Sequence, residues 1–132
     1  MNDFLELTQG LLEKNDFEDK PNVLEDGDYI VEVNNIQKRT SQNGNEYVSV
    51  VLKITDGDAT GRLIFDNVFF TAKTAEGNIK RIYKLAQMSN LELVTFTDID
   101  SIVSFLTGIV GNTYNVSYAE NNFHKVTYNA ML

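Results

Sequence analysis

The chain has 132 residues, of which 42% are hydrophobic and 23% charged, a composition typical of one soluble folded domain with a single core. It contains no cysteine, which excludes a disulfide framework and a thiolate metal site. No apolar run reaches the roughly 18 residues of a membrane-spanning helix. The N-terminus also lacks the basic stretch of a secretory signal. We therefore expect an intracellular protein with no cofactor and no membrane contact.

The formal net charge of −8 is unevenly distributed along the chain. Residues 1–28 carry nine acids and two bases, for −7; residues 29–91 carry eight bases and six acids, for +2; residues 92–132 carry four acids and one base, for −3. The local charge of a groove matters more to the binding of a polyanion than the net charge of the protein. The net charge of −8 therefore does not exclude a nucleic-acid partner. We expect an acidic leader over 1–26 and a binding domain over 27–132.

The leader has two interpretations. Residues 3–14 place apolar side chains at helical spacing, and residues 15–26, which contain the only proline, predict a loop. The helical stripe consists of Phe4, Leu7 and Leu11. In one interpretation the stripe packs on the domain or frays, and the acids are solvated. In the other it docks on a partner or a second subunit, while the acids mimic DNA and keep the basic face free until DNA displaces them.

From Gly27 onward the apolar period is two. Residues 27–40 predict a first strand, the Asn43-Gly44 pair a hairpin turn, and residues 46–55 a second strand. The second strand alternates clearly, with Val48, Val50, Leu52 and Ile54 on one face and Tyr47, Ser49, Val51 and Lys53 on the other. The segment DGDATG then predicts a second turn. It resembles the opening of a calcium loop, but its twelfth position is Asn67 rather than glutamate, which favours a plain turn.

The third strand, GRLIFDNVFF (61–70), has an ambiguous register because Asp66 and Asn67 interrupt its apolar run. With Arg62 outside, we expect Leu63 and Phe65 to point into the core. A β-bulge at Asp66-Asn67 would then turn Phe69 outward while Val68 and Phe70 pack inside.

Two helices and two strands complete the predicted order. Residues 74–90 carry an apolar helical stripe of Ile79, Ile82, Tyr83 and Ala86, with Lys80, Arg81 and Lys84 off it. A second helix begins at the capping pattern of residues 97–100 and stops at Gly111. Residues 113–119 and 123–131 predict a closing hairpin. In its last strand we expect Val126, His124 and Tyr128 inside and Phe123 and Lys125 outside.

The predicted fold class is mainly β with a helical insertion, in the order β-β-β-α(α)-β-β. This is the element order of the five-stranded OB-fold barrel, whose strands 2 and 3 commonly bind oligonucleotides or oligosaccharides. Another α+β arrangement with a three-stranded meander is the alternative.

The segment from Leu24 to Phe70 resembles the N-terminal half of a family of small phage proteins. The shared features are the Gly-Asp-Tyr opening, the Asn-Gly hairpin and the run Gly61-Arg62 to Phe65-Asp66-Asn67. That family was long filed as a domain of unknown function and is thought to include phage single-stranded DNA-binding proteins. The resemblance implies a location in the cytoplasm of a bacterial host, with phage recombinase or replication proteins as candidate partners and a homo-oligomer as an open alternative. Bacterial single-stranded DNA-binding proteins usually end in an acidic tail that recruits partners, whereas this chain ends YNAML, so the acidic leader would have to supply that function.

Binding of single strands without sequence preference needs aromatic rings on which bases stack and cations along the backbone path. The candidate residues are Lys38, Arg39, Tyr47, Lys53, Arg62, Phe69, Lys73, Phe123 and Lys125. Each of them could instead be an ordinary solvated side chain. No P-loop, dinucleotide fingerprint or nucleophile motif is present, so we expect a non-enzymatic protein. The rival function is a protein–protein or phage structural adaptor module on the same barrel.

Overall fold

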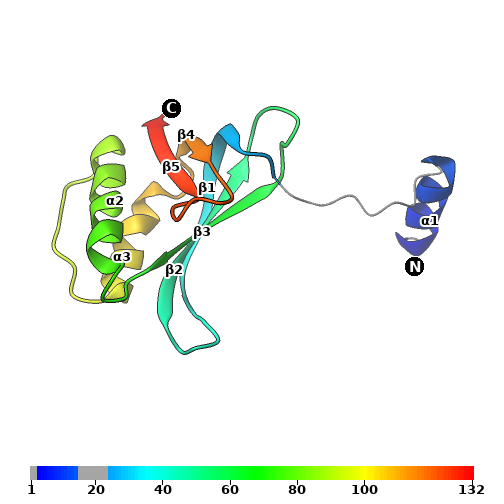
Figure 1. Cartoon of the computed structure of the whole chain (residues 1–132). Coiled ribbons are helices and arrows are strands. Elements are labelled where there is room, and N and C mark those ends of the chain that lie inside the picture. Colours follow the sequence, from blue (N-terminus) through cyan, green and yellow to red (C-terminus); the bar gives the residue numbers. More distant parts are fainter. Residues whose placement is uncertain (1–2, 15–23) are drawn as a thin grey trace.

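The computed structural model describes residues 3–14 and 24–132 (Figure 1). Its helices are α1 (Asp3–Lys14), α2 (Ala75–Met88) and α3 (Ile99–Leu106), the last continued by a 3₁₀ turn η1 (Thr107–Ile109). Its strands are β1 (Gly27–Thr40), β2 (Glu46–Ile54), β3 (Leu63–Phe69), β4 (Thr113–Tyr118) and β5 (Val126–Met131). The predicted order of three strands, two helices and two strands is confirmed. Most of the loop predicted over 15–26 lies outside the described residues.

The five strands form one antiparallel sheet in the order β3-β2-β1-β4-β5. The long strand β1 is central, because its first half pairs with β4 and most of its length pairs with β2. Strands β3 and β5 are the two edges, and no backbone ladder joins them anywhere in the described chain. The sheet is therefore open, and closure into an OB barrel is not confirmed.

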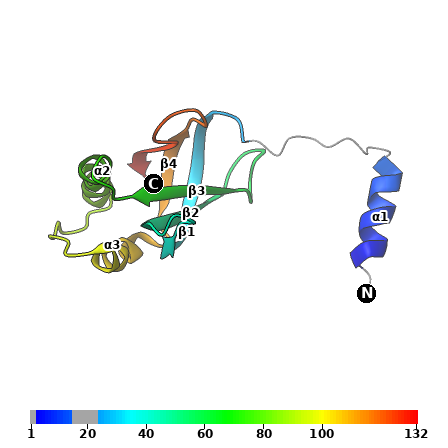
Figure 2. The ribbon, with the colours of Figure 1, turned by 60° about the horizontal axis from the view of Figure 1, so that its bottom comes forward.

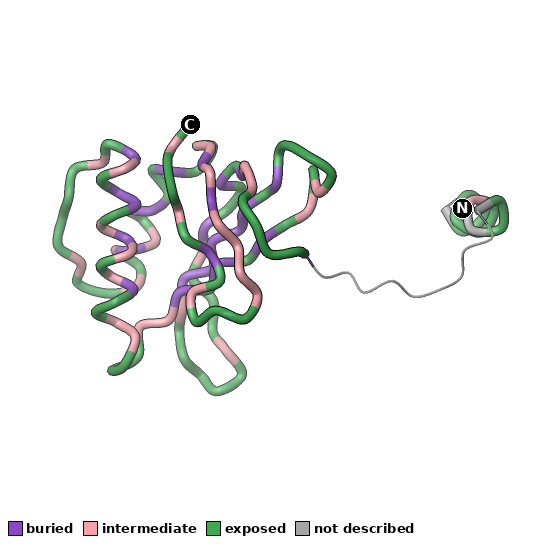
Figure 3. The backbone as a smooth tube through the Cα atoms, turned by 45° about the horizontal axis from the view of Figure 1, so that its top comes forward, coloured by how far each residue is buried: buried purple, intermediate pink, exposed green. Residues whose placement is uncertain are grey.

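One face of the sheet is covered by the helices, with α3 against β1 and β2 and α2 beside β3 and β5 (Figures 1 and 2). The core lies between these layers and is built from side chains that alternate along the strands, as Figure 3 shows in purple. Val48, Val50, Leu52 and Ile54 are all buried there, as the alternation in β2 predicts. We call this the inner face of the sheet and the opposite side the outer face. None of the helices in the described segments has the length and apolar character needed to cross a bilayer.

One turn and one cap have the conformations that their residues predict. Gly44 has φ +82°, the left-handed region that favours glycine, and its N–H donates to the Ser41 carbonyl at 2.9 Å. At the start of α3 the Asp98 carboxylate accepts from the Ser101 N–H at 2.7 Å, and the Ser101 hydroxyl in turn accepts from the Asp98 N–H at 3.2 Å. This capping box fixes where α3 begins.

A β-bulge in β1 decides which of its side chains face outward. The register with β2 shifts between Val33 and Asn35, so Asn34 is the extra residue. Val31 and Val33 are buried before the bulge, whereas Ile36 is buried after it. As a result Lys38 lies on the inner side with Ile36, while Arg39 lies on the outer face.

The expected register of β3 is wrong. Its pairing with β2 runs without interruption from Lys53↔Leu63 to Tyr47↔Phe69, so there is no bulge at Asp66-Asn67. Ile64, Asp66 and Val68 are buried, whereas Leu63 is 46% and Phe65 53% exposed. Leu63 and Phe65 therefore belong to the outer face rather than the core. The outward position of Phe69 and the packing of Val68 and Phe70 are as expected.

Two smaller expectations also need correction. Strand β5 begins at Val126 rather than at residue 123, so Phe123 and Lys125 lie in the loop between β4 and β5. On α2, Asn78 and Arg81 face the sheet, because both join a polar network with β3 and β5. Arg81 was expected on the solvent side of the helix.

Candidate nucleic-acid interface

The outer face of β1, β2 and β3 consists of four rows of side chains that run across the strands. The registers define them: a residue of β1 pairs with one of β2, which pairs with one of β3. From one end to the other the rows are Arg39–Tyr47–Phe69, Gln37–Ser49–Asn67, Asn35–Val51–Phe65 and Glu32–Lys53–Leu63. Two rows with aromatic rings thus flank a row of polar side chains.

The row at the hairpin end is a stacked aromatic pair beside a guanidinium. The rings of Tyr47 and Phe69 lie 4.6 Å apart between centroids, at an interplanar angle of 25°. Arg39 occupies the β1 position next to Tyr47 and is exposed. A ring pair of this kind presents π-faces to a ligand and a cation beside them.

Phe65 supplies the third ring of the outer face and is the main residue that sequence reasoning missed. Its side chain is 53% exposed, far more than a core phenylalanine. Val51 beside it is only 7% exposed, although it also points outward. The sequence signal for this register was the spacing of Ile64, Asp66 and Val68 at every second position. It predicts an exposed Phe65 only if an aspartate is accepted as a buried residue.

The charges of the outer face favour an anionic ligand. Glu32 is the one acid among the four rows, and it pairs across the strands with Lys53. The bases of the rows are Arg39 and Lys53. Lys38 is not among them, because its Nζ binds Glu46 and Asp100, at 3.1 Å each, on the inner side. These contacts, the one with Asp100 above all, raise the pKa of Lys38. Its role is to tie the β1–β2 hairpin to the start of α3.

A groove of about 420 Å³ runs between the edge of β3 and the loop before β5. It brings together two candidate aromatic residues, Phe69 and Phe123, with Lys125 and the newly found Phe65. Phe123 is 80% exposed and stands edge-on to His124, with ring centroids 4.8 Å apart. A second hollow of about 360 Å³ shares Phe65 and Lys125 with the first and is lined at its far end by Arg62.

Seven of the nine candidate residues thus fall into two groups. Arg39, Tyr47, Lys53 and Phe69 lie on the outer face itself. Arg62, Phe123 and Lys125 line the adjoining groove. The two left outside these groups are Lys38, which is on the inner side, and Lys73, which is exposed in the loop before α2.

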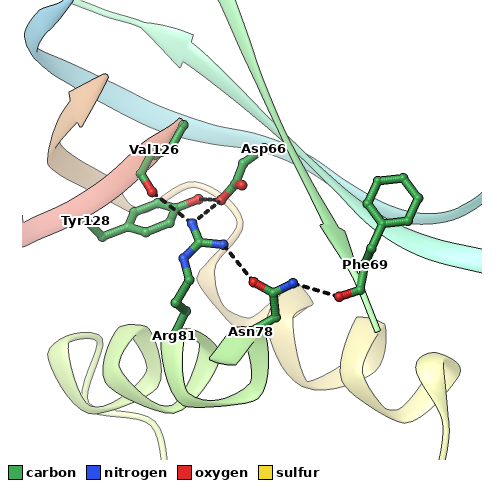
Figure 4. Close-up of polar contacts among 6 residues, drawn as sticks. All are labelled: Asp66, Phe69, Asn78, Arg81, Val126 and Tyr128. Carbon is green, nitrogen blue, oxygen red and sulfur yellow. Dashed lines mark hydrogen bonds and ion pairs between the residues drawn. The ribbon is translucent and has the colours of Figure 1, made fainter. Parts of the chain in front are cut away.

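A polar network forms the floor of the groove and joins the two edge strands through side chains (Figure 4). The Asp66 carboxylate of β3 accepts from the Tyr128 hydroxyl of β5 at 3.0 Å and from the Arg81 guanidinium of α2 at 3.3 Å. Arg81 also donates to the Val126 carbonyl at 2.8 Å and to the Asn78 side chain at 3.4 Å. Asn78 in turn donates to the Phe69 carbonyl at 2.6 Å. Asp66 is therefore a compensated buried charge, and its carboxylate does not face a ligand on the outer surface.

Four ionisable groups around the groove and the adjoining hollow have shifted pKa values. Burial, with the Asp66 carboxylate beside it, raises the pKa of Tyr128 well above its ordinary value, so this hydroxyl stays protonated and donates to Asp66. Burial, with the nearby Arg81 charge, lowers the pKa of His124 from 6.5. Hydrogen bonds from Tyr118 and Lys125 lower the pKa of Glu120, and the Glu120 contact raises that of Tyr118 to about 12.

The described residues contain no group of three or more histidine, cysteine or acidic side chains arranged to hold a metal ion. The arrangement offers no evident nucleophile–base pair either. What it does offer is exposed rings, amide side chains and cations on one continuous surface, which suits binding of a flexible anionic chain with π-faces.

Comparison with known proteins gives one family and no named relative. No curated protein matches the chain. A family model described as "Protein of unknown function (DUF669)" matches residues 11–131, which spans nearly the whole chain. The chain therefore belongs to the DUF669 family.

Proposed function

We propose that this protein is a non-enzymatic single-stranded DNA-binding protein whose binding surface is the outer face of β1–β3 with the adjoining groove. The observation that carries the proposal is the set of cross-strand rows, in which two rows with aromatic rings, half-buried Tyr47 and Phe69 and exposed Phe65, flank a row of polar side chains, with cations beside them. Stacking on such rings contributes about 1–3 kcal/mol per base and tolerates any base, because every base has a π-face.

The rings lie far enough apart for two bases of one strand to stack on different rings. Phe65 and Phe69 lie on the same side of β3, four residues apart, which at about 3.4 Å per residue separates them by roughly 14 Å. Arg39 and Lys53 lie beside the two ends of this path, and Arg62 and Lys125 line the groove along it. Bases would stack on the rings, and phosphates would pass the cations.

The connectivity supports an OB-like, partly open barrel as the finer description of the fold. Strand β1 pairs with both β2 and β4, and β3 and β5 run parallel to each other because each is antiparallel to a neighbour of β1. The network of Asp66, Arg81 and Tyr128 then takes the place of a backbone ladder at the seam between them. OB folds are often partly open barrels that bind oligonucleotides on strands 2 and 3.

Within this proposal the protein coats single strands during phage replication or recombination, in the cytoplasm of a bacterial host. Phage recombinase or replication proteins are the candidate protein partners. The resemblance of the Gly61–Asn67 stretch to small phage proteins supports this setting.

The rival function is a protein-interaction module, which the exposed apolar side chains of Leu63, Phe65 and Phe123 favour. The two functions differ in their response to salt. Counterion release weakens DNA binding with a slope of about −0.7 per phosphate neutralised, so contacts from four cations would give a slope of about −3. A dry apolar contact tolerates added salt.

Fluorescence anisotropy with a labelled oligo-dT of about 30 nucleotides, long enough for at least one OB-sized site, tests the proposal. We expect binding that weakens with salt, that exceeds binding to a duplex of equal length, and that Tyr47→Ala or Lys53→Ala reduces. Leu93→Ala is the matched control, because Leu93 is 45% exposed on the connection between α2 and α3, away from the rows. No binding at tens of micromolar protein in low salt would refute the proposal.

A further inference from the structure

Helix α1 carries an apolar stripe with no cover in the described contacts of the chain. Phe4 is 70%, Leu7 61% and Leu12 69% exposed, while the side chain of Leu11, also expected in the stripe, lies outside the described residues. A helix of 12 residues is marginal in water on its own, and Gly10 weakens this one further. The stripe therefore needs an apolar surface against which to pack.

The outer face of the sheet matches this helix in size and in chemistry. Twelve helical residues span about 18 Å, and the stretch of β3 from Leu63 to Phe69 spans about 20 Å. That stretch exposes Leu63 and Phe65, which are apolar like the stripe. The face is bordered by bases, whereas residues 1–23 carry six acids and two bases, for a net −4.

The connection to the sheet is long enough for the helix to reach this face. Leu24, the first described residue after α1, is buried and lines the hollow that continues the groove at its Arg62 end. Nine residues lie between Lys14 and Leu24 in the sequence, and the ten residue-to-residue steps that join them can span up to about 35 Å. This distance exceeds the length of the face, so the helix can lie along it.

We propose that α1 occupies the outer face of its own chain when no DNA is bound, and that single-stranded DNA displaces it. The inference rests on the proposed function for the identity of the competing ligand. The contact itself is apolar, since Glu6 and Glu13 fall on the opposite side of the helix from the stripe. Their charges then point away from the sheet, where they repel an approaching phosphate chain, and the net negative charge of the segment steers docking onto the basic surface.

Competition of this kind has a measurable effect on DNA affinity. The apparent affinity falls in proportion to the fraction of molecules whose face is free, so docking in two thirds of the molecules lowers it about threefold. Leu7→Asp, which puts a charge into the stripe, should therefore tighten oligo-dT binding about threefold or more. Glu6→Gln removes one charge but leaves the stripe intact and should change affinity less.

Paramagnetic NMR on the full chain tests the contact without relying on DNA. Because the chain has no cysteine, Gln9→Cys gives a unique site for a nitroxide label beside the stripe. In ¹⁵N-labelled protein we expect broadened amide signals for Phe65, Asn67 and Phe69 but not for Glu76 on the exposed side of α2. Adding Leu7→Asp or oligo-dT should restore them.

Two results would overturn the inference. One is the absence of selective broadening on the face. The other is broadening that is equally present when ¹⁵N-labelled chains without nitroxide are mixed with unlabelled chains that carry it, because the helix would then occupy a second copy. If the broadening is present and Leu7→Asp removes it, but oligo-dT neither binds nor restores the signals, the helix contact stands and the proposed function fails. The two failures are thus distinguishable.

Discussion

The network between the edge strands makes a quantitative prediction, because Arg81 connects three elements, namely α2, β3 and β5. Replacing Arg81 with methionine keeps most of the aliphatic stem but removes the hydrogen bonds to Asp66, Val126 and Asn78. The Asp66 side chain is only 9% exposed and would keep Tyr128 as its partner, while the Val126 carbonyl would lose its donor.

Breaking a buried ion pair costs about 3–5 kcal/mol, and a hydrogen bond to a charged group contributes about 1.5–3 kcal/mol. Because the Arg81 side chain is 21% exposed, water can replace part of the loss. We therefore expect Arg81→Met to lower the free energy of unfolding by about 2–4 kcal/mol, a large share of the 5–15 kcal/mol typical of a domain.

Urea unfolding followed by circular dichroism measures this loss. Lys84→Met is the matched control, since it removes the same charge from an exposed position of the same helix and should cost about 0.5 kcal/mol or less. Asp66→Asn should cost less in the Arg81→Met background than alone, with a coupling of about 1–2 kcal/mol. If Arg81→Met costs no more than Lys84→Met, the seam is not held by this network.

Three further predictions follow from single residues. Arg39→Ala should weaken oligo-dT binding and reduce the salt slope by about 0.7, whereas Lys38→Ala should leave both within error. Neighbouring strand residues point to opposite faces, and the bulge places Arg39 rather than Lys38 on the outer one; equal effects would contradict the assignment. His124, the single histidine, should titrate by NMR below 6.5 in the free protein, and its pKa should rise when phosphates enter the groove; an unchanged value would place DNA elsewhere. Because its folded pKa is lowered, the unfolded chain binds more protons below about 6.5, so the free energy of unfolding should rise as the pH rises through this window, and His124→Gln should flatten that slope. Asp98→Ala removes the capping box of α3 and should cost about 1 kcal/mol in thermal or urea unfolding, whereas a loss near zero would mean that packing alone fixes the helix start.

Strands β1 and β2 could be predicted almost to the residue, because their signals are local. Val48 to Ile54 alternate strictly, and the Asn43-Gly44 pair supplies the positive φ that the hairpin needs. The start of α3 was equally readable, because both partners of its cap lie within four residues.

The register of β3 could not be read from its own residues. A buried aspartate is favourable only because Arg81, fifteen residues later, and Tyr128, sixty-two residues later, both reach it. Without them, burying Phe65 instead of Asp66 is the reasonable expectation. The exposed Phe65 is thus the consequence of a tertiary network.

The sequence contained a signal that Arg39, rather than Lys38, lies on the outer face. An alternation that runs through β1 without interruption misses it. Buried apolar residues fall at odd positions up to Val33 and at an even position from Ile36, which is the mark of an extra residue between them. Nothing in the sequence indicated that Phe123 and Phe69 line the same groove, because the loop before β5 and the edge of β3 meet only in the folded chain.

The central claim is that single-stranded DNA binds the outer face of β1–β3. The most direct measurement is an amide chemical-shift map of the ¹⁵N-labelled protein titrated with oligo-dT. We expect the largest changes at Arg39, Ser49, Phe65 and Asn67 and none at Ile102, on the helical side of the sheet. Changes confined to the helices, or no changes at saturating oligonucleotide, would contradict the claim.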